Sequence, residues 1–313
     1  MPGTSLPASA KPDTIMSVDF SRTPMTASET FETYRSYLFS IAYRMLGSVM
    51  DAEDMVQETY LRYQSASPAN ILSLKAYLTT ILTRLCIDQL QLAYRQRETY
   101  LGPWLPEPII TAGSEAPQAE EDAVMRESLS VAFLVMLERL QPVERAVFLL
   151  REVFDYDYPD IADFVGRKPA ACRQIFSRAK KRLAERRRQA APSPDANRRL
   201  LQAYLEAVRA GDSTRLMNVL AEDITLVADG GGKVAGAALQ PVIGRTEVAQ
   251  FSIGASRRFL PPTYEVELSE INHQPAIIAR AGGRALVVMT IEIEDDRVRT
   301  VRFMANPDKL GHL

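Results

Sequence analysis

The stretch YPDIADFVGRKPAACRQIFSRAK, residues 158–180, determines how the rest of the chain is interpreted. Its apolar spacing predicts a short helix with Ile161 and Val165 inward, a turn at Gly166, and a second helix that begins at Pro169. Proline is well tolerated at that position, because the first helical N–H lacks an intrahelical acceptor. This order of elements is that of a helix-turn-helix.

The second of these helices is strongly basic. Residues 167–188 hold ten Lys and Arg against one acidic residue, although the whole chain has a net charge of -2. Such a helix can place its first residues at base edges in the major groove while its later cations hold phosphates. A solvated basic face is the alternative, and Lys168 stands where a Ser or Thr cap would be usual. The predicted DNA-binding residues here are Lys168, Arg173, Gln174, Ser177, Arg178, Lys180 and Lys181.

Upstream, residues 29–98 predict a compact bundle of three helices, because apolar residues recur there at three- and four-residue steps. Gly47 is expected to end the first helix, and Asp51 is expected to cap the second. The third helix is expected to run from near Leu72 to about Arg97.

Four further segments of the chain differ in composition or pattern. Residues 1–28 are rich in Pro, Ser, Thr and Ala and predict a disordered tail, and prolines and glycines interrupt residues 99–122, which predict a linker. A second helical module is expected over 123–190, with one helix from Ala123 to Leu140. Short β-branched strands dominate after residue 198. The predicted fold is therefore multidomain, with two all-α modules followed by an α+β domain over residues 198–313.

Hydrophobic residues make up 46% and charged residues 24% of the chain, which is typical of globular proteins. No stretch approaches the ~18 consecutive apolar residues of a spanning helix. Cys86 and Cys172 have no paired spacing, and His273 and His312 have no carboxylate or Cys at metal spacing. We therefore expect structural thiols, no cofactor or metal, no membrane partner, and a reducing cytoplasm.

Residues 51–63 read DAEDMVQETYLRY, with polar residues one turn apart on the outer face of a helix. Alone, this pattern is more often a solvated face. Combined with the bundle and the basic helix-turn-helix, the run D-A-E-D-x-x-Q-E resembles the sigma-70 superfamily of RNA polymerase sigma factors. That resemblance implies core RNA polymerase as a partner, through the β′ clamp helices and the β flap. The implied polymerase-binding residues are Asp51, Glu53, Asp54, Gln57 and Glu58.

The resemblance also gives a role to the third helix of the bundle, which ends in Tyr94-Arg95-Gln96-Arg97. In the family this helix faces the minus-ten promoter element, where a flipped base is held and basic side chains follow the strand. The basic helix-turn-helix would read the minus-thirty-five element. Ordinary exposed charges at a helix end are the alternative. The implied residues are Arg84, Asp88, Arg95 and Arg97.

The linker contains G-P-W-L-P-E-P over residues 102–108, with the only Trp of the chain. It resembles the linker of an extracytoplasmic-function subgroup with a fused, cone-shaped SnoaL-like domain. The runs DGGGK at 229–233 and NPDKL at 306–310 are similar to the other signatures of that subgroup. We expect these segments to regulate the sigma modules in cis, although both runs could merely close turns. The expected contact residues are Trp104, Leu105, Pro106, Glu107, Pro108, Asp229, Lys233, Asn306, Pro307, Asp308, Lys309 and Leu310.

Two other functions are compatible with parts of this pattern. SnoaL-like domains include cyclases and isomerases, for which Asp223, Asp229 and His273 would be the acid–base candidates. A one-component regulator could bind DNA and sense a small ligand or a protein with its third domain. The DAEDxxQE helix argues against the latter, because such a regulator has no use for a polymerase-docking bundle.

Overall fold

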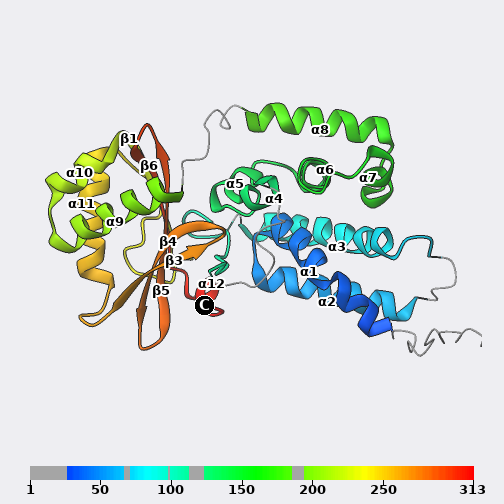
Figure 1. The fold of residues 1–313 in the computed structure, drawn as a ribbon, viewed down its shortest axis with the longest axis horizontal. Coiled ribbons are helices and arrows are strands. Elements are labelled where there is room, and N and C mark those ends of the chain that lie inside the picture. Colours follow the sequence, from blue (N-terminus) through cyan, green and yellow to red (C-terminus); the bar gives the residue numbers. More distant parts are fainter. Residues whose placement is uncertain (1–26, 67–70, 98, 113–122, 185–193) are drawn as a thin grey trace, which may run out of the picture.

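The computed structural model describes residues 27–66, 71–97, 99–112, 123–184 and 194–313. Two helical modules lie beside a sheet domain (Figure 1). Most of the predicted tail lies outside the described residues, although Ala27 and Ser28, which were expected in it, already belong to the first helix. None of the described helices is long and apolar enough to cross a membrane.

The first module is the predicted bundle of three helices. Gly47 ends the first of them with φ at 67°, a left-handed conformation that glycine adopts without strain. The helices are α1 (Ala27–Leu46), α2 (Val49–Ser65) and α3 (Leu74–Arg97).

The N-cap of α2 differs from the prediction. Ser48, and not Asp51, has the extended backbone of a cap, and its side-chain oxygen accepts a hydrogen bond from Asp51 N at 3.1 Å. Asp51 therefore lies in the first turn, where its carboxylate interacts favourably with the positive end of the helix dipole. The expectation for Asp51 was wrong because the helix begins earlier, at Val49, where Ser48 caps the free N–H of Asp51.

The second module contains the helix-turn-helix, with Gly166 at the turn and φ at 65°. The single helix expected over residues 123–140 is two helices, because Ser130 starts a new one by accepting a hydrogen bond from Phe133 N at 3.2 Å. The helices of this module are α4 (Ala123–Glu127), α5 (Val131–Leu137), α6 (Pro142–Glu152), α7 (Tyr158–Val165) and α8 (Pro169–Ala184).

The two helical modules share one hydrophobic core, which contains buried residues from α1, α2, α3, α5, α6 and α8. Two buried arginines cross between them. Arg44 of α1 donates to Ser128 Oγ at 2.8 Å and Met125 O at 2.9 Å, and Arg145 of α6 donates to Met45 O at 2.7 Å. The modules are therefore packed against each other and are not separate domains on a loose tether.

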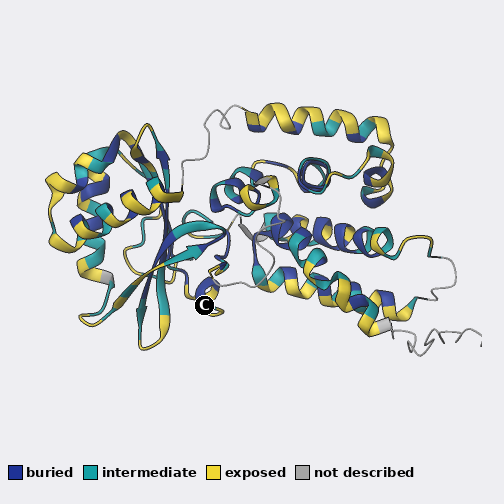
Figure 2. Cartoon of the chain, in the orientation of Figure 1, coloured by how far each residue is buried: buried dark blue, intermediate teal, exposed yellow. Residues whose placement is uncertain are grey.

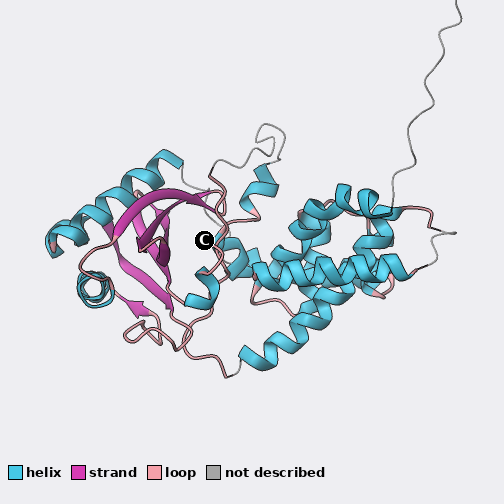
Figure 3. Cartoon of the chain, turned by 90° about the horizontal axis from the view of Figure 1, so that it is seen from below, coloured by secondary structure: helices cyan, strands magenta, loops and turns pink. Residues whose placement is uncertain are grey.

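The third domain is a curved six-stranded sheet with three helices on one face (Figures 1 and 3). Strand order is β2-β1-β6-β5-β4-β3, and only the β1–β6 pair is parallel. Strands follow residue 198 as predicted, and β2 has only two residues. The elements are α9 (Pro194–Ala210), α10 (Ser213–Val219), β1 (Leu220–Asp229), β2 (Val242–Ile243), α11 (Arg245–Phe259), β3 (Glu265–Ile271), β4 (Gln274–Ala281), β5 (Arg284–Glu294), β6 (Arg297–Met304) and α12 (Pro307–Leu310).

The sheet is apolar on both faces, and each face has a different cover. Residues such as Ile277 and Met289 point toward α9, α10 and α11. Their neighbours Ile278 and Val288 point the other way and pack with Leu105 of the linker. Because successive residues of a strand face opposite sides, β4 and β5 contribute to both layers. The sheet thus stands between the helices of its own domain and the linker that joins the two helical modules.

Candidate interdomain site

The linker is a buried segment that runs between α1 and α2 on one side and the sheet on the other. Leu105 is 1% exposed and Glu107 is 7% exposed. Ile110 forms an isolated antiparallel bridge with Ile271, and Thr111 N donates to Glu270 O at 2.9 Å. The described part of the linker therefore makes backbone contacts with the third domain along much of its length.

A buried ion pair joins the DGGGK and NPDKL runs to this linker. Lys309 Nζ lies 2.7 Å from Asp229 Oδ2 and 2.5 Å from Leu105 O, and the same carboxylate oxygen accepts from Leu105 N at 2.8 Å. Asp229 is fully buried and Lys309 nearly so. Both charges and the backbone of Leu105 are thereby satisfied without water, as a buried pair requires.

Aromatic side chains enclose this pair. Lys309 Nζ lies 4.1 Å from the centroid of the Trp104 ring and 5.3 Å from that of Tyr100. The Tyr100 hydroxyl donates to Asp229 Oδ1 at 2.5 Å and accepts from Asn306 Nδ2 at 3.0 Å. Burial and the adjacent Asp229 carboxylate raise the pKa of Tyr100, so this hydroxyl remains a donor. We call this set the clasp: Tyr100, Trp104, Leu105, Asp229, Asn306 and Lys309.

Two glycines allow the clasp to close. Gly47, at the end of α1, lies under the Trp104 ring, where a Cβ would stand 2.8 Å from Cη2. Gly231 has φ at 58°, and a Cβ there would overlap the Asn306 side chain. A larger residue at either position would force the linker or the NPDKL run away.

Glu107 connects the linker to the helix expected to bind polymerase. Its carboxylate accepts from Val49 N at 2.6 Å and from Ser48 Oγ at 3.0 Å, at the positive end of α2. Its backbone N donates to Gly47 O at 2.8 Å. The Tyr43 hydroxyl donates to its carbonyl oxygen at 2.6 Å. Glu107 thus acts as an additional N-terminal cap supplied from outside the bundle.

Asn272 joins three parts of the chain and was not predicted. It is fully buried, and its side-chain amide donates to the Tyr43 hydroxyl at 2.7 Å and to Leu129 O at 2.8 Å. Its side-chain oxygen accepts from Ile109 N at 3.0 Å. Asn272 and His273 form the two-residue β3–β4 turn with φ at 52° and 57°, which favours Asn at the first position. That preference was the one signal in the sequence.

The remaining NPDKL and linker residues surround these contacts. Pro307 starts α12, Leu310 is buried in the layer that contains Leu105, and His312 Nε2 lies 2.7 Å from Pro108 O. Lys233 pairs with Asp308 at 2.5 Å, but both side chains are more than half exposed. The structure therefore brings together the linker, DGGGK and NPDKL runs that the sequence singled out, with Pro106 close to Gly47.

The acidic face of α2 is open to solvent. Glu53, Asp54 and Gln57 are exposed. Glu53 pairs with Arg35 at 2.8 Å, at the surface of the bundle. Asp51 accepts from Gln89 Nε2 at 3.0 Å. Glu58, which is partly exposed, pairs with Arg62 along the same helix at 2.8 Å.

The residues proposed for the minus-ten element have mixed placements. Arg84 of α3 donates to Phe164 O at 3.2 Å and Asp163 O at 2.9 Å, which are carbonyls at the end of α7. Asp88 is exposed. The side chains of Arg95 and Arg97 lie outside the described part of the structure. In this arrangement Arg84 links the bundle to the helix-turn-helix.

The outer face of α8 is exposed over its whole length (Figure 2). Arg173 lies 5.8 Å from the Tyr158 ring centroid, and Lys180 pairs with Glu152 at 3.0 Å. Cys172, on the opposite side, is buried. The exposed residues include all those predicted to meet DNA in this helix: Arg173, Gln174, Ser177, Arg178, Lys180 and Lys181. Lys168, which directly precedes the helix, is exposed as well.

Comparison with known families agrees with this arrangement. Residues 30–97 match the family model described as Sigma-70 region 2, and residues 130–183 match that described as Sigma-70, region 4. The first match covers α1 to α3, and the second covers α5 to α8. The two matches therefore correspond to the two helical modules.

The similarity to known proteins extends over nearly the whole chain. The chain is 35% identical over 288 residues to the ECF RNA polymerase sigma factor SigJ of Mycobacterium tuberculosis, covering 89% of this chain and 91% of SigJ. The crystal structure of SigJ superposes with a TM-score of 0.70, 32% identity and coverage of 91% of this chain and 98% of that chain. A SnoaL-like protein of unknown function from Burkholderia thailandensis covers 37% of this chain and 97% of its own, with 18% identity and a TM-score of 0.28. The chain belongs to the extracytoplasmic-function family of RNA polymerase sigma factors.

Proposed function

We propose that the third domain of this sigma factor regulates transcription initiation in cis, by holding regions 2 and 4 in a packed arrangement that must open on the promoter. The observation that carries the proposal is the position of Asn272, which hydrogen-bonds to the bundle, to the linker and to the segment before α5 at once. A single buried side chain of the third domain thereby connects all the parts whose spacing matters.

Promoter reading requires these parts to separate. The minus-ten and minus-thirty-five elements are about 25 base pairs apart, or about 85 Å at ~3.4 Å per pair. Here Arg84 of region 2 is in direct contact with Phe164 of region 4, and the two regions share one core. The packed arrangement therefore cannot span both elements, and the contacts between the regions have to be exchanged for contacts with polymerase and DNA.

Control would act on spacing, because the binding faces remain accessible. The acidic side chains of α2 and the basic side chains of α8 are exposed. We propose that α2 docks on the β′ clamp helices, that region 4 meets the β flap, and that α8 reads the minus-thirty-five element. The packed chain could then meet polymerase in the cytoplasm through one face, while the clasp resists the extension of the linker that the second contact needs.

The test compares two lysines of the same two runs in run-off transcription with purified core polymerase. Lys309→Met removes the buried pair with Asp229, whereas Lys233→Met removes the exposed pair with Asp308. We expect higher transcription from Lys309→Met and from a chain that ends at Ala305, and unchanged transcription from Lys233→Met. Circular dichroism checks that each variant is folded. Equal activities and core affinities for the full-length, shortened and Lys309→Met proteins would show that the clasp is only structural.

A catalytic role for the third domain has little support from the positions of its acid–base candidates. Asp223 is exposed and pairs with Arg299 at 2.6 Å, and Asp229 is bound within the clasp. His273 lies in the β3–β4 turn, near Glu270. These three side chains do not share a site. We therefore propose that this domain, like the rest of the sigma factor, catalyses no chemical reaction.

A further inference from the structure

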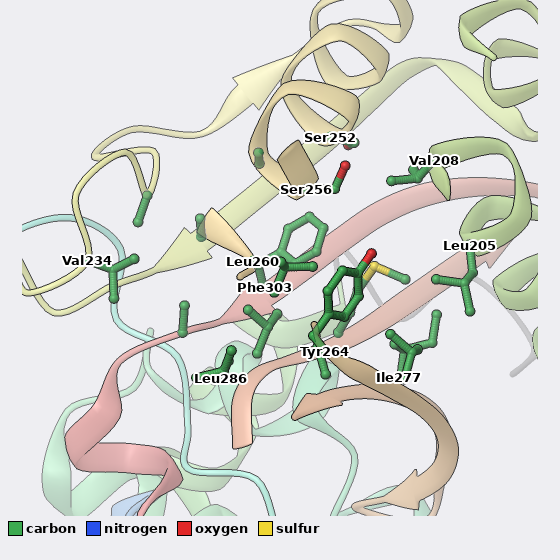
Figure 4. Close-up of a pocket in the computed structure, with 18 of the residues that line it drawn as sticks. Leu205, Val208, Val234, Ser252, Ser256, Leu260, Tyr264, Ile277, Leu286 and Phe303 are labelled. Carbon is green, nitrogen blue, oxygen red and sulfur yellow. The ribbon is translucent and has the colours of Figure 1, made fainter. Parts of the chain in front are cut away.

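The third domain contains a cavity on the opposite side of the sheet from the linker. Its volume is about 330 Å³, and it lies between α9, α11 and strands β3 to β6. Figure 4 shows side chains pointing toward a common space, among them Phe303 of β6 and Leu260 and Tyr264 of the segment between α11 and β3. A cavity of this volume is at the lower end of the range for small-molecule sites, roughly 300–1,000 Å³.

The lining is almost entirely apolar. Among the residues that form the cavity there is no Asp, Glu, His or Lys, and the one charged side chain, Arg209, is exposed. The Ser252 hydroxyl donates to Val248 O at 2.7 Å, and the Ser256 hydroxyl donates to Ile253 O at 2.9 Å. An ionised ligand would lose its hydration without a buried counter-charge, so the lining favours an uncharged molecule.

One polar group remains to orient such a molecule. Within the described residues, the Tyr264 hydroxyl has no hydrogen-bond partner, and Figure 4 shows its ring among the lining side chains. A phenol can both donate and accept. The chemistry therefore suits a largely apolar ligand with one hydrogen-bonding group.

Small residues keep the space open. Six of the lining residues are alanines, and Gly236 adds another position without a side chain beyond Cα. Protein interiors are otherwise close-packed, and apolar walls that face a void lose their dispersion contacts. Larger side chains at these alanines would fill the cavity and increase the stability of the domain. Their absence is better explained by a ligand that occupies the space.

We propose that this cavity binds an uncharged, largely apolar small molecule, and that its occupancy changes the clasp. Ala228 lines the cavity and precedes Asp229, while Ala305 and Pro307 line it on either side of Asn306. Ile277 and Val287 face the cavity, and the next residues on their strands face the linker layer. The coupling rests on the proposed regulatory function, whereas the binding does not.

Binding is tested with the full chain and N-phenylnaphthylamine, an uncharged dye whose emission rises in apolar surroundings. Ala279→Phe on β4 and Ala255→Phe on α11 fill the cavity from opposite walls. Leu268→Phe, on the exposed part of β3, adds the same ring outside it. We expect saturable binding of the dye to the wild type and to Leu268→Phe. In both filled variants the affinity for the dye should fall by a factor of at least about ten. Absent saturation, or equal affinities in folded filled variants, would overturn the site.

Coupling is tested with Trp104, the only Trp of the chain and a member of the clasp. Decanol, which has no ultraviolet absorption that interferes, is added to dye-free protein while the tryptophan emission is recorded. We expect a saturable change in emission in the wild type and in Leu268→Phe, but not in Ala279→Phe. If decanol displaces the dye and the Trp104 emission stays unchanged, the cavity is a binding site without influence on the clasp, and the coupling is wrong. Neither measurement involves polymerase. A negative result in either would therefore not decide the proposed regulatory function, which the transcription test addresses separately.

Discussion

The side-chain amide of Asn272, in the third domain, donates to the hydroxyl oxygen of Tyr43, in region 2, across 2.7 Å in the buried interior. The Tyr43 hydroxyl in turn donates to Glu107 O of the linker. The two residues are 229 positions apart in the sequence. These two hydrogen bonds connect region 2 and the linker to the β3–β4 turn, so we expect the stability of the packed chain to depend on that turn.

The first prediction tests that dependence. Tyr43→Phe leaves the Asn272 amide with one partner fewer and should lower the free energy of unfolding by about 1–3 kcal/mol, because a buried donor loses its acceptor. Asn272→Asp keeps the turn conformation but removes both donated hydrogen bonds. In chemical denaturation the double variant should lose less than the sum of the two, whereas Tyr34→Phe on the same helix should lie within about 0.5 kcal/mol of wild type. Strict additivity would show that the two residues are not coupled.

The second prediction concerns the two ion pairs that join the same pair of sequence runs. Lys309→Met leaves Asp229 buried and unpaired and should lower the free energy of unfolding by about 3–5 kcal/mol. Lys233→Met removes an exposed pair and should change it by less than about 1 kcal/mol. Denaturant titration followed by Trp104 fluorescence measures both. Similar losses for the two variants would mean that burial does not distinguish the pairs.

The third prediction addresses the acidic face of α2. Glu53→Lys combined with Asp54→Lys should weaken binding to core polymerase, because the exposed face reverses its charge. The helical circular dichroism should stay unchanged, since neither side chain is buried. Glu206→Lys on α9 is the control for a change of net charge far from that face. Core affinity is measured by titration in pull-down, and an unaltered value for the double reversal would remove α2 from the interface.

The fourth prediction separates base reading from phosphate binding on α8. Arg173→Ala should reduce discrimination between promoter sequences by about 1–3 kcal/mol if Arg173 contacts a base. Lys181→Ala should weaken binding to all sequences alike and lower the slope of log K against log salt by about 0.9. Quantitative binding to matched and mismatched duplexes at several salt concentrations tests both. Unchanged promoter preference in Arg173→Ala would assign that residue to the backbone.

The fifth prediction follows from the two thiols. Burial raises the pKa of both Cys86 and Cys172, so little thiolate forms at neutral pH. A thiol reagent should therefore modify neither residue in the native protein and both in denaturant. Because the thiol pKa is higher in the folded than in the unfolded state, the contribution of the neutral thiols to the free energy of unfolding is fully present below the unfolded pKa. It should be lost as the pH rises from the unfolded pKa through the folded-state pKa. Rapid labelling of the native chain at pH 7 would contradict this assignment.

Much of the fold was predictable because periodicity and turn residues are local signals. Gly47 and Gly166 mark helix ends, and β-branched residues indicated the strands after residue 198. The errors were also local. Ser48 replaced Asp51 as a cap, and Ser130 divided a helix whose apolar pattern continues through it. Such competition between neighbouring capping side chains is settled by backbone angles, which the pattern does not contain.

The sequence indicated which runs form the candidate site, but not which of their residues are in contact. The resemblance selected the linker, DGGGK and NPDKL runs, and the structure brings Leu105, Asp229 and Lys309 together. Asn272 and Tyr43 were missed, because a buried polar pair far apart in sequence has no periodic signature. Arg84 was read as a DNA contact, yet its guanidinium meets α7, a partner that only the packing of two modules creates. Whether it also meets DNA in an opened state stays a prediction.

The position of Lys309 has a consequence in time. Glu107 and Lys309 are about 200 residues apart, and a ribosome adds roughly 5–20 residues per second, so some 10–40 s pass between their syntheses. Region 2 is complete before Glu107 is added, and region 4 is made early in that interval, before any residue of the sheet that later meets the linker. Each newly made chain therefore has a period in which both sigma regions exist and Asp229 and Lys309 do not yet form a pair. A slowly translated or interrupted message would lengthen that period and yield, from the same gene, sigma regions without their regulator.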